Sequence, residues 1–127
     1  MKILVVDDST LMRTIIRRSL SSIDSVELEV LEAEDGVQAI ATFAEHGKSI
    51  DLILCDMNMP NGNGLTLLRS LQAMDSFEGT AFVLVTADLG DSRTDDALRE
   101  GAAAVLGKPF RPEEIAELVR NNVTASG

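Results

Sequence analysis

Residues 51–64, DLILCDMNMPNGNG, combine a buried strand, a carboxylate at its end and the start of a helix. The run at residues 51–55 is almost wholly apolar, which is typical of a strand buried on both faces of a parallel sheet. Asp56 follows this run directly, and Asn63 is a suitable N-cap for an amphipathic helix over the residues after it. The stretch predicts a strand-to-helix connection with an acidic residue at the turn.

The same alternation of strand and helix recurs along the whole chain. Further apolar runs occupy residues 2–6, 81–85 and 103–106, while residues 27–31 alternate charged and apolar side chains, as in a strand with one wetter face. Helical patterns separate these runs, with starts at Ser9 or Thr10, at Asp91 or Ser92 and at Pro112, and ends at Gly47 and near Gly101. This alternation predicts parallel strands that are joined by right-handed helical crossovers. We therefore predict an α/β, doubly wound five-stranded parallel sheet with five helices and the flavodoxin-like strand order 2-1-3-4-5.

Composition restricts the class of protein. The 127 residues are 45% hydrophobic and 25% charged, which favours one domain, predicted at residues 1–122, with residues 123–127 as a C-terminal tail or the start of a linker. A net charge of −10 opposes direct binding to nucleic acid or to an anionic membrane.

The single cysteine and the absence of long apolar runs bear on location. Cys55 excludes an internal disulfide, and we interpret it as a small core residue rather than a redox sensor. No transmembrane or secretory pattern is present, so a cytoplasmic location is expected.

Polar residues follow the ends of four predicted strands. Asp7 and Asp8 follow the first, Asp56 the third, Thr86 the fourth and Lys108 the fifth. Because ligands bind outside the carboxyl ends of strands in open parallel sheets, these side chains are expected to meet at one edge.

Such a cluster of carboxylates predicts a metal site. Like charges held together repel, and a hard divalent cation relieves that repulsion. Mg²⁺ prefers oxygen ligands, so we expect Mg²⁺, with Mn²⁺ as a substitute, at Asp7, Asp8, Asp56 and the main-chain carbonyl of Asn58.

The same cluster favours phosphoryl transfer. Asp56, on the central strand, is the expected nucleophile, since a carboxylate can attack phosphorus to form an acyl phosphate. Lys108 and the metal would neutralise phosphoryl oxygens, and Thr86 would donate a hydrogen bond to another.

These residues resemble the CheY-like receiver domain family of response regulators. The resemblance extends from Lys2 to about Val119, and four motifs carry it: ILVVDDS at residues 3–9, DMNMPNGNG at 56–64, Thr86-Ala87, and Lys108-Pro109-Phe110. Together these motifs are specific to the family.

The resemblance implies a phosphorylation switch of a two-component system that is no conventional enzyme. Asp56 would be the phosphoacceptor and a sensor histidine kinase or phosphotransfer protein the donor. Thr86 would move on activation, the Lys108-Pro109 bond would be cis, and Asn58 and Asp88 would tune the lifetime of the phosphoryl group.

The implied output is a change of the surface near the fourth helix, fifth strand and fifth helix, which controls an unknown protein target or effector domain. The resemblance is compatible with a monomer or a phosphorylation-dependent dimer. Val105 departs from the family pattern, because an aromatic residue usually stands three positions before the lysine. The switch therefore cannot use the turning of an aromatic ring at this position.

Two other classes of function compete with the switch. An Asp-dependent phosphohydrolase would commonly carry a second aspartate two residues after the nucleophile, where this chain has Asn58. A receiver that binds partners without phosphorylation would not need the full set of acids.

Overall fold

Strands and helices alternate along the chain as predicted. The computed structural model describes residues 1–23, 27–59 and 62–126, so Pro60 and Asn61 of the quoted motif and Gly127 of the predicted tail lie outside the described residues. The elements are β1 (Lys2–Val6), α1 (Thr10–Ser21), β2 (Glu29–Ala33), α2 (Gly36–His46), the 3₁₀ helix η1 (Gly47–Ser49), β3 (Leu52–Asp56), β4 (Asn58–Met59), β5 (Gly62–Asn63), α3 (Gly64–Gln72), the 3₁₀ helix η2 (Asp75–Phe77), β6 (Ala81–Thr86), α4 (Ser92–Arg99), β7 (Ala104–Gly107) and α5 (Pro112–Ser126).

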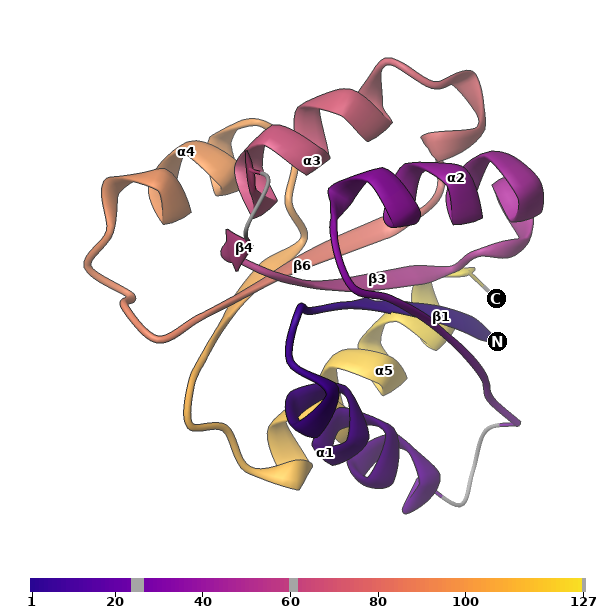
Figure 1. Ribbon diagram of the computed structural model, residues 1–127. Helices are drawn as coiled ribbons and strands as arrows, with labels where there is room; N and C mark the ends of the chain where they lie inside the picture. Colours follow the sequence, from indigo (N-terminus) through magenta and orange to yellow (C-terminus); the bar gives the residue numbers. More distant parts are fainter. Residues whose placement is uncertain (24–26, 60–61, 127) are drawn as a thin grey trace.

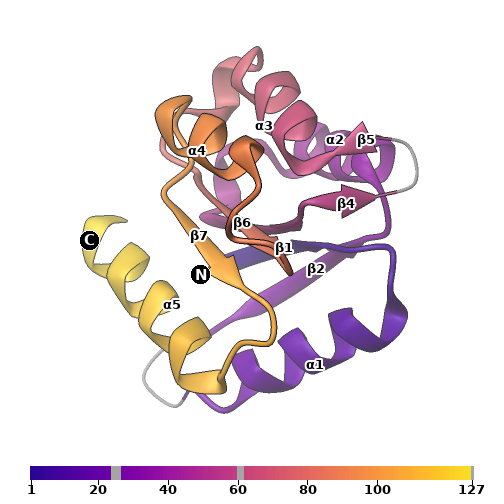
Figure 2. The same cartoon turned by 90° about the vertical axis from the view of Figure 1, so that its left-hand side faces the viewer.

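A parallel sheet forms the middle layer of the molecule. Its strand order is β2-β1-β3-β6-β7, which is the predicted order 2-1-3-4-5 once the short β4 and β5 are set aside. Helices α1 and α5 cover one face, and α2, α3 and α4 cover the other (Figures 1 and 2). The predicted fold class is confirmed, and β3, which ends in Asp56, is the central strand.

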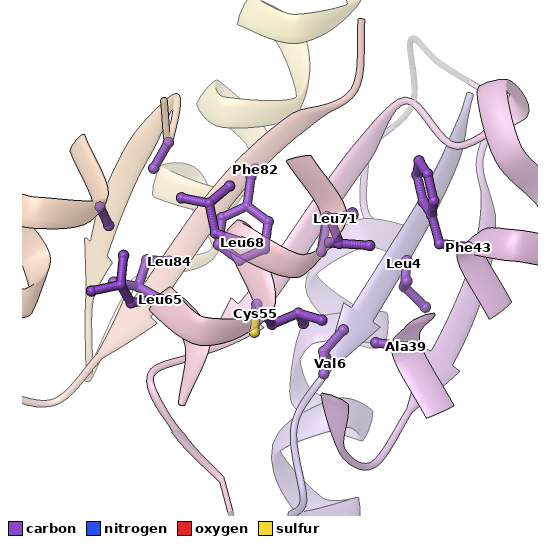
Figure 3. Packing of buried hydrophobic residues seen from close by; sticks show 14 of the residues in the cluster. Leu4, Val6, Ala39, Phe43, Cys55, Leu65, Leu68, Leu71, Phe82 and Leu84 are labelled. Atoms are coloured by element: carbon purple, nitrogen blue, oxygen red, sulfur yellow. The ribbon is translucent and has the colours of Figure 1, made fainter. Parts of the chain in front are cut away.

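Alternate residues of the central strands fill two separate cores. On β3, Leu52 and Leu54 face α1 and α5, while Ile53 and Cys55 belong to the core beneath α2, α3 and α4. Figure 3 shows this second core, with Cys55 pointing in among side chains of the helices. Each fully buried Leu or Ile stabilises the fold by about 1.5–3 kcal/mol. The prediction that Cys55 is a core residue is confirmed.

Side-chain caps fix where the helices begin. Ser9 accepts a hydrogen bond from the backbone of Met12 at 3.1 Å, and Asn63 accepts one from Thr66 at 2.9 Å. Asp91 caps α4 in the same way. Such caps contribute about 1 kcal/mol each, and these three place the starts of α1, α3 and α4 beside the carboxyl edge of the sheet.

Several features differ from the sequence prediction or lie outside it, among them β7, which begins and ends one residue later than residues 103–106. Strand β2 begins and ends two residues later than residues 27–31, in a register that pairs Lys2 with Glu29. β4 and β5 form an antiparallel hairpin beside α3 where no strand was predicted (Figure 2). α5 continues to Ser126, beyond the predicted domain end at residue 122, and that boundary stays a prediction. Across the described residues, no helix has the length and apolarity that crossing a membrane requires.

Candidate functional site

The ends of four neighbouring strands bring the predicted site residues together. Asp56 is the last residue of β3 and Thr86 the last of β6, while Asp7 and Lys108 each follow a strand by one residue. Because β3 lies between β1 and β6, Asp56 stands at the middle of this edge. The predicted convergence of these side chains is therefore what the structure shows.

Three carboxylates lie close together at this edge. Asp7, Asp8 and Asp56 each offer an oxygen within 4.8 Å of the others. Asp7 is 2% exposed and Asp56 9%, whereas Asp8 is open to solvent. Carboxylate oxygens at this spacing suit a hard cation such as Mg²⁺. Because Asp8 is exposed, such a cation could keep several of its waters, as Mg²⁺ does when few carboxylates bind it.

Lys108 supplies the cation that contacts two of these carboxylates. Its Nζ lies 3.0 Å from Oδ1 of Asp56 and 3.4 Å from Oδ2 of Asp7. Its backbone N–H donates to the carbonyl of Thr86 at 2.7 Å, which ties the loop after β7 to the end of β6. The Lys108-Pro109 peptide bond is cis, as the resemblance implies.

The electrostatics of the cluster leave it short of positive charge. Burial raises the pKa of Asp56 above its ordinary value; the Lys108 ammonium offsets part of that rise, and the Asp7 carboxylate adds to it. Burial alone would lower the pKa of Lys108, but the Asp56 and Asp7 carboxylates outweigh burial, and the pKa is raised. Lys108 therefore stays charged, and its single ammonium contacts two of the three carboxylates. A bound divalent cation would complete the charge balance.

Thr86 lies at the edge, but its hydroxyl is engaged elsewhere. The side chain is 1% exposed, and Oγ1 accepts a hydrogen bond from the backbone N–H of Asp88 at 3.1 Å. Oγ1 also lies 3.4 Å from the carbonyl oxygen of Asp88, to which it donates. For Thr86 to donate to a group on Asp56, its hydroxyl has to give up the hydrogen bond that it donates to the Asp88 carbonyl.

The residues expected to tune the site occupy its rim. The Asn58 backbone slightly lowers the pKa of Asp56, and the Asn58 side-chain oxygen lies 3.5 Å from a guanidinium nitrogen of Arg93. Asp88 is exposed, and its carboxylate accepts from the backbone of Gly90 at 2.9 Å. Val105 lies farther back on β7, half-buried against the core beneath α2, α3 and α4.

Two further residues at this edge were not identified from the sequence. Arg13 on α1 donates a hydrogen bond to the main-chain carbonyl of Asp7 at 2.5 Å. Leu89 is 62% exposed, yet it lies against Gly107, where an added Cβ would be 3.0 Å from Leu89 Cδ1. The available signals were a basic residue one turn after the Ser9 cap and an isolated leucine in a polar loop, and neither specifies a contact.

The fold and this edge define a doubly wound parallel α/β protein whose carboxylate site lies at the carboxyl ends of its strands. Residues 3–120 match the response regulator receiver domain family. Over 128 residues the chain is 35% identical to a chemotaxis protein CheY homolog of Campylobacter jejuni. The aligned region covers 100% of this chain and 96% of that protein.

Solved structures agree with the sequence matches. The response regulator receiver domain protein of Clostridium thermocellum has a TM-score of 0.88 at 27% identity, over 98% of this chain and 95% of that chain. A putative two-component system response regulator/GGDEF domain protein has a TM-score of 0.86 at 32% identity, over 98% of this chain and 49% of that one. The chain belongs to the response regulator receiver domain family and is CheY-like.

Proposed function

We propose that this domain is a phosphorylation switch in which Asp56 accepts a phosphoryl group in a Mg²⁺-dependent reaction. The observation that carries the proposal is the meeting of Asp7, Asp8 and Asp56 with Lys108 at the carboxyl edge of the sheet. The donor would be the phosphohistidine of a sensor histidine kinase or of a phosphotransfer protein.

The residues around Asp56 have distinct roles in this transfer. A side-chain oxygen of Asp56 attacks phosphorus, the phosphorus–nitrogen bond of phosphohistidine breaks, and the imidazole leaves with the electron pair and takes up a proton from water. Lys108, 3.0 Å from Asp56, neutralises one phosphoryl oxygen.

The metal would be held by Asp7, Asp8, Asp56 and the main-chain carbonyl of Asn58. Bound there, Mg²⁺ or Mn²⁺ supplies charge neutralisation to the phosphoryl oxygens. Asn58 and Asp88 flank the site, and we assign them control of the water that later hydrolyses the acyl phosphate.

The output of the switch would pass through Thr86. When its hydroxyl turns to the phosphoryl group, the hydrogen bonds to Asp88 are lost and the loop to α4 is released. In that loop, the Leu89 carbonyl accepts a hydrogen bond from the Thr94 hydroxyl of α4 at 3.4 Å. The Leu89 side chain lies against Gly107 of β7. The surface of α4, β7 and α5 would change, and a partner protein or an effector domain would respond.

Acetyl phosphate tests the proposal directly. With Mg²⁺, the wild type should gain one phosphoryl group by intact-protein mass spectrometry, and chelation of the metal by EDTA should abolish the gain. Asp56→Asn should gain nothing, whereas Asp51→Asn, which alters the acid just before the other end of β3, should behave as the wild type. A gain that persists in Asp56→Asn would exclude Asp56 as the acceptor. Steady turnover of a phosphate ester would assign the chain to the phosphohydrolases instead.

A further inference from the structure

Arg13 connects the candidate metal site to the edge of the sheet. Three different nitrogens of its guanidinium contact three groups: Nη1 the carbonyl of Asp7 at 2.5 Å, Nε the Glu32 carboxylate at 3.1 Å, and Nη2 the hydroxyl of Thr10 at 3.3 Å. The Arg13 side chain is only 13% exposed. Because its planar guanidinium is hydrogen-bonded to three groups, the Arg13 side chain is far more rigid than that of an exposed arginine or lysine.

The Asp7 carbonyl that the Arg13 guanidinium contacts comes from a residue of the candidate metal site. The Asp7 carbonyl belongs to the peptide bond that joins Asp7 to Asp8, and both residues contribute carboxylates to the cluster. The orientation of that peptide plane sets the direction in which the chain leaves β1, and with it the direction in which Asp8 projects.

The other polar groups of Asp7 are also bound. Its N–H donates to the carbonyl of Ala33 at 3.1 Å, and its Oδ1 accepts from the backbone of Ser9 at 2.8 Å. The remaining oxygen, Oδ2, faces Lys108. Arg13 therefore completes a set of bonds that fixes Asp7 on both its backbone and its side chain.

Glu32 provides the anchor on the other side of Arg13. Arg17, one turn further along α1, donates to the same carboxylate at 2.8 Å. The hydrogen bond from Arg17 lowers the pKa of Glu32 against the opposing effect of partial burial, and Arg13 adds to the lowering. Glu32 thus remains ionised at neutral pH, and it holds the Arg13 guanidinium against the exposed edge strand β2.

We propose that Arg13 is a positioning residue for the divalent cation site, which it shapes by holding the peptide bond between Asp7 and Asp8. The inference rests on the proposed function, because it concerns the metal that the phosphoryl transfer requires. The guanidinium contacts the backbone of Asp7, so its action on the metal passes through the placement of the two carboxylates.

Electrostatics and positioning predict opposite effects of removing Arg13. Loss of a positive charge beside a cation site should strengthen metal binding, because the cations repel one another. Loss of the positioning bond should weaken metal binding, because the two carboxylates must then be ordered when the metal binds. The sign of the change therefore separates the two explanations.

The experiment is a calorimetric Mg²⁺ titration of the unphosphorylated chain. Arg13→Gln should weaken binding about tenfold, and Arg13→Lys should weaken it to a similar degree, since one ammonium cannot reach all three partners. Arg17→Gln is the matched control: it removes the same charge from the same helix and from the same partner, Glu32, but does not contact Asp7. It should change the affinity less than about twofold.

Two comparisons keep the outcome decisive. Glu32→Gln leaves both arginines in place and weakens the anchor, so it should give an intermediate loss of affinity even if Arg13→Gln does not fold. Urea denaturation without metal reports whether each variant is folded. Wild-type affinity in Arg13→Gln and Arg13→Lys would overturn the inference while leaving the proposed function intact. Absence of Mg²⁺ binding by the wild type would instead reject the proposed function.

Discussion

The Lys108 ammonium lies 3.0 Å from Asp56 Oδ1 and 3.4 Å from Asp7 Oδ2, so one cation after β7 joins the ends of β3 and β1. The same two side chains belong to the cluster of carboxylates that could hold a metal ion. Under the proposed function, Lys108 and a divalent cation would compete for these carboxylates before phosphorylation and would both neutralise the phosphoryl oxygens during the transfer.

Replacement of Lys108 separates these two effects. Lys108→Ala should bind Mg²⁺ more tightly than the wild type, because a competing cation is gone, yet its phosphorylation by acetyl phosphate should slow by about 10²-fold or more. Calorimetry and timed mass spectrometry measure the two quantities. Lys48→Ala, which removes an exposed lysine before β3, is the control and should leave both unchanged. Unaltered phosphorylation in Lys108→Ala would contradict the role proposed for the ammonium.

The hydroxyl of Thr86 should be needed for the response more than for the transfer. In Thr86→Ala, phosphorylation of Asp56 should still proceed, but amide hydrogen exchange at residues 88–94 should no longer change on phosphorylation, since the hydroxyl that leaves Asp88 is absent. Thr86→Ser keeps the hydroxyl and should retain the response. An undiminished exchange response in Thr86→Ala would show that the signal leaves the site by another route.

Gly64 permits the close approach of α3 to the end of β3. An added Cβ would overlap Leu84 Cδ1 and lie 3.0 Å from the Asp56 carbonyl oxygen, which is backbone and cannot turn away. Gly64→Ala should lower the free energy of unfolding in urea by about 1–3 kcal/mol. Gly36→Ala, at the start of α2, meets only Leu67 at 4.0 Å and should be close to neutral. Equal stability of the two variants would mean that α3 shifts freely.

The Asp91–Arg93 ion pair should make the free energy of unfolding depend on pH in the acidic range. Hydrogen bonds from the Arg93 side chain and backbone lower the pKa of Asp91 from its ordinary value of 3.8 to about 2. A carboxyl whose pKa is depressed by folding stabilises the protein above its unfolded pKa and loses that effect as the pH falls through the folded pKa. The pH window is therefore about 4 down to 2.

Asp91→Asn keeps an oxygen to cap α4 but removes the charge. Its deficit in unfolding free energy relative to the wild type should be full at neutral pH and should shrink between about pH 4 and pH 2, as measured by urea denaturation at a series of pH values. Asp95→Asn removes the same charge from an exposed position on α4 and controls for the overall charge. A deficit independent of pH would exclude the ion pair as its source.

The strand order and the meeting of the site residues could be predicted because few physical rules determine them. Apolar runs separated by helical patterns leave little choice but a parallel sheet, and its carboxyl ends share one edge. Asp56 and Lys108 are 52 positions apart in sequence, yet each stands at or just after a strand end, so their proximity follows from topology.

Other features depend on information that periodicity does not contain. The alternation around β2 fits two registers equally, since a shift of two residues leaves every side chain on the same face. β4 and β5 are too short to show any pattern. The contact between Arg13 and Asp7 depends on the reach of a long side chain and on Glu32 lying across from it, and a helical repeat only shows which face is apolar.

The burial of Cys55 beside Asp56 has a practical consequence. Burial raises the pKa of this thiol well above its usual range, so reagents that alkylate thiolates should leave the native protein almost unmarked. No other cysteine occurs in the sequence. Alkylation would therefore report only on openings that expose the middle of the sheet. Its rate, followed with and without an acyl phosphate on Asp56, would show whether phosphorylation loosens or tightens the strand that is proposed to receive the phosphoryl group.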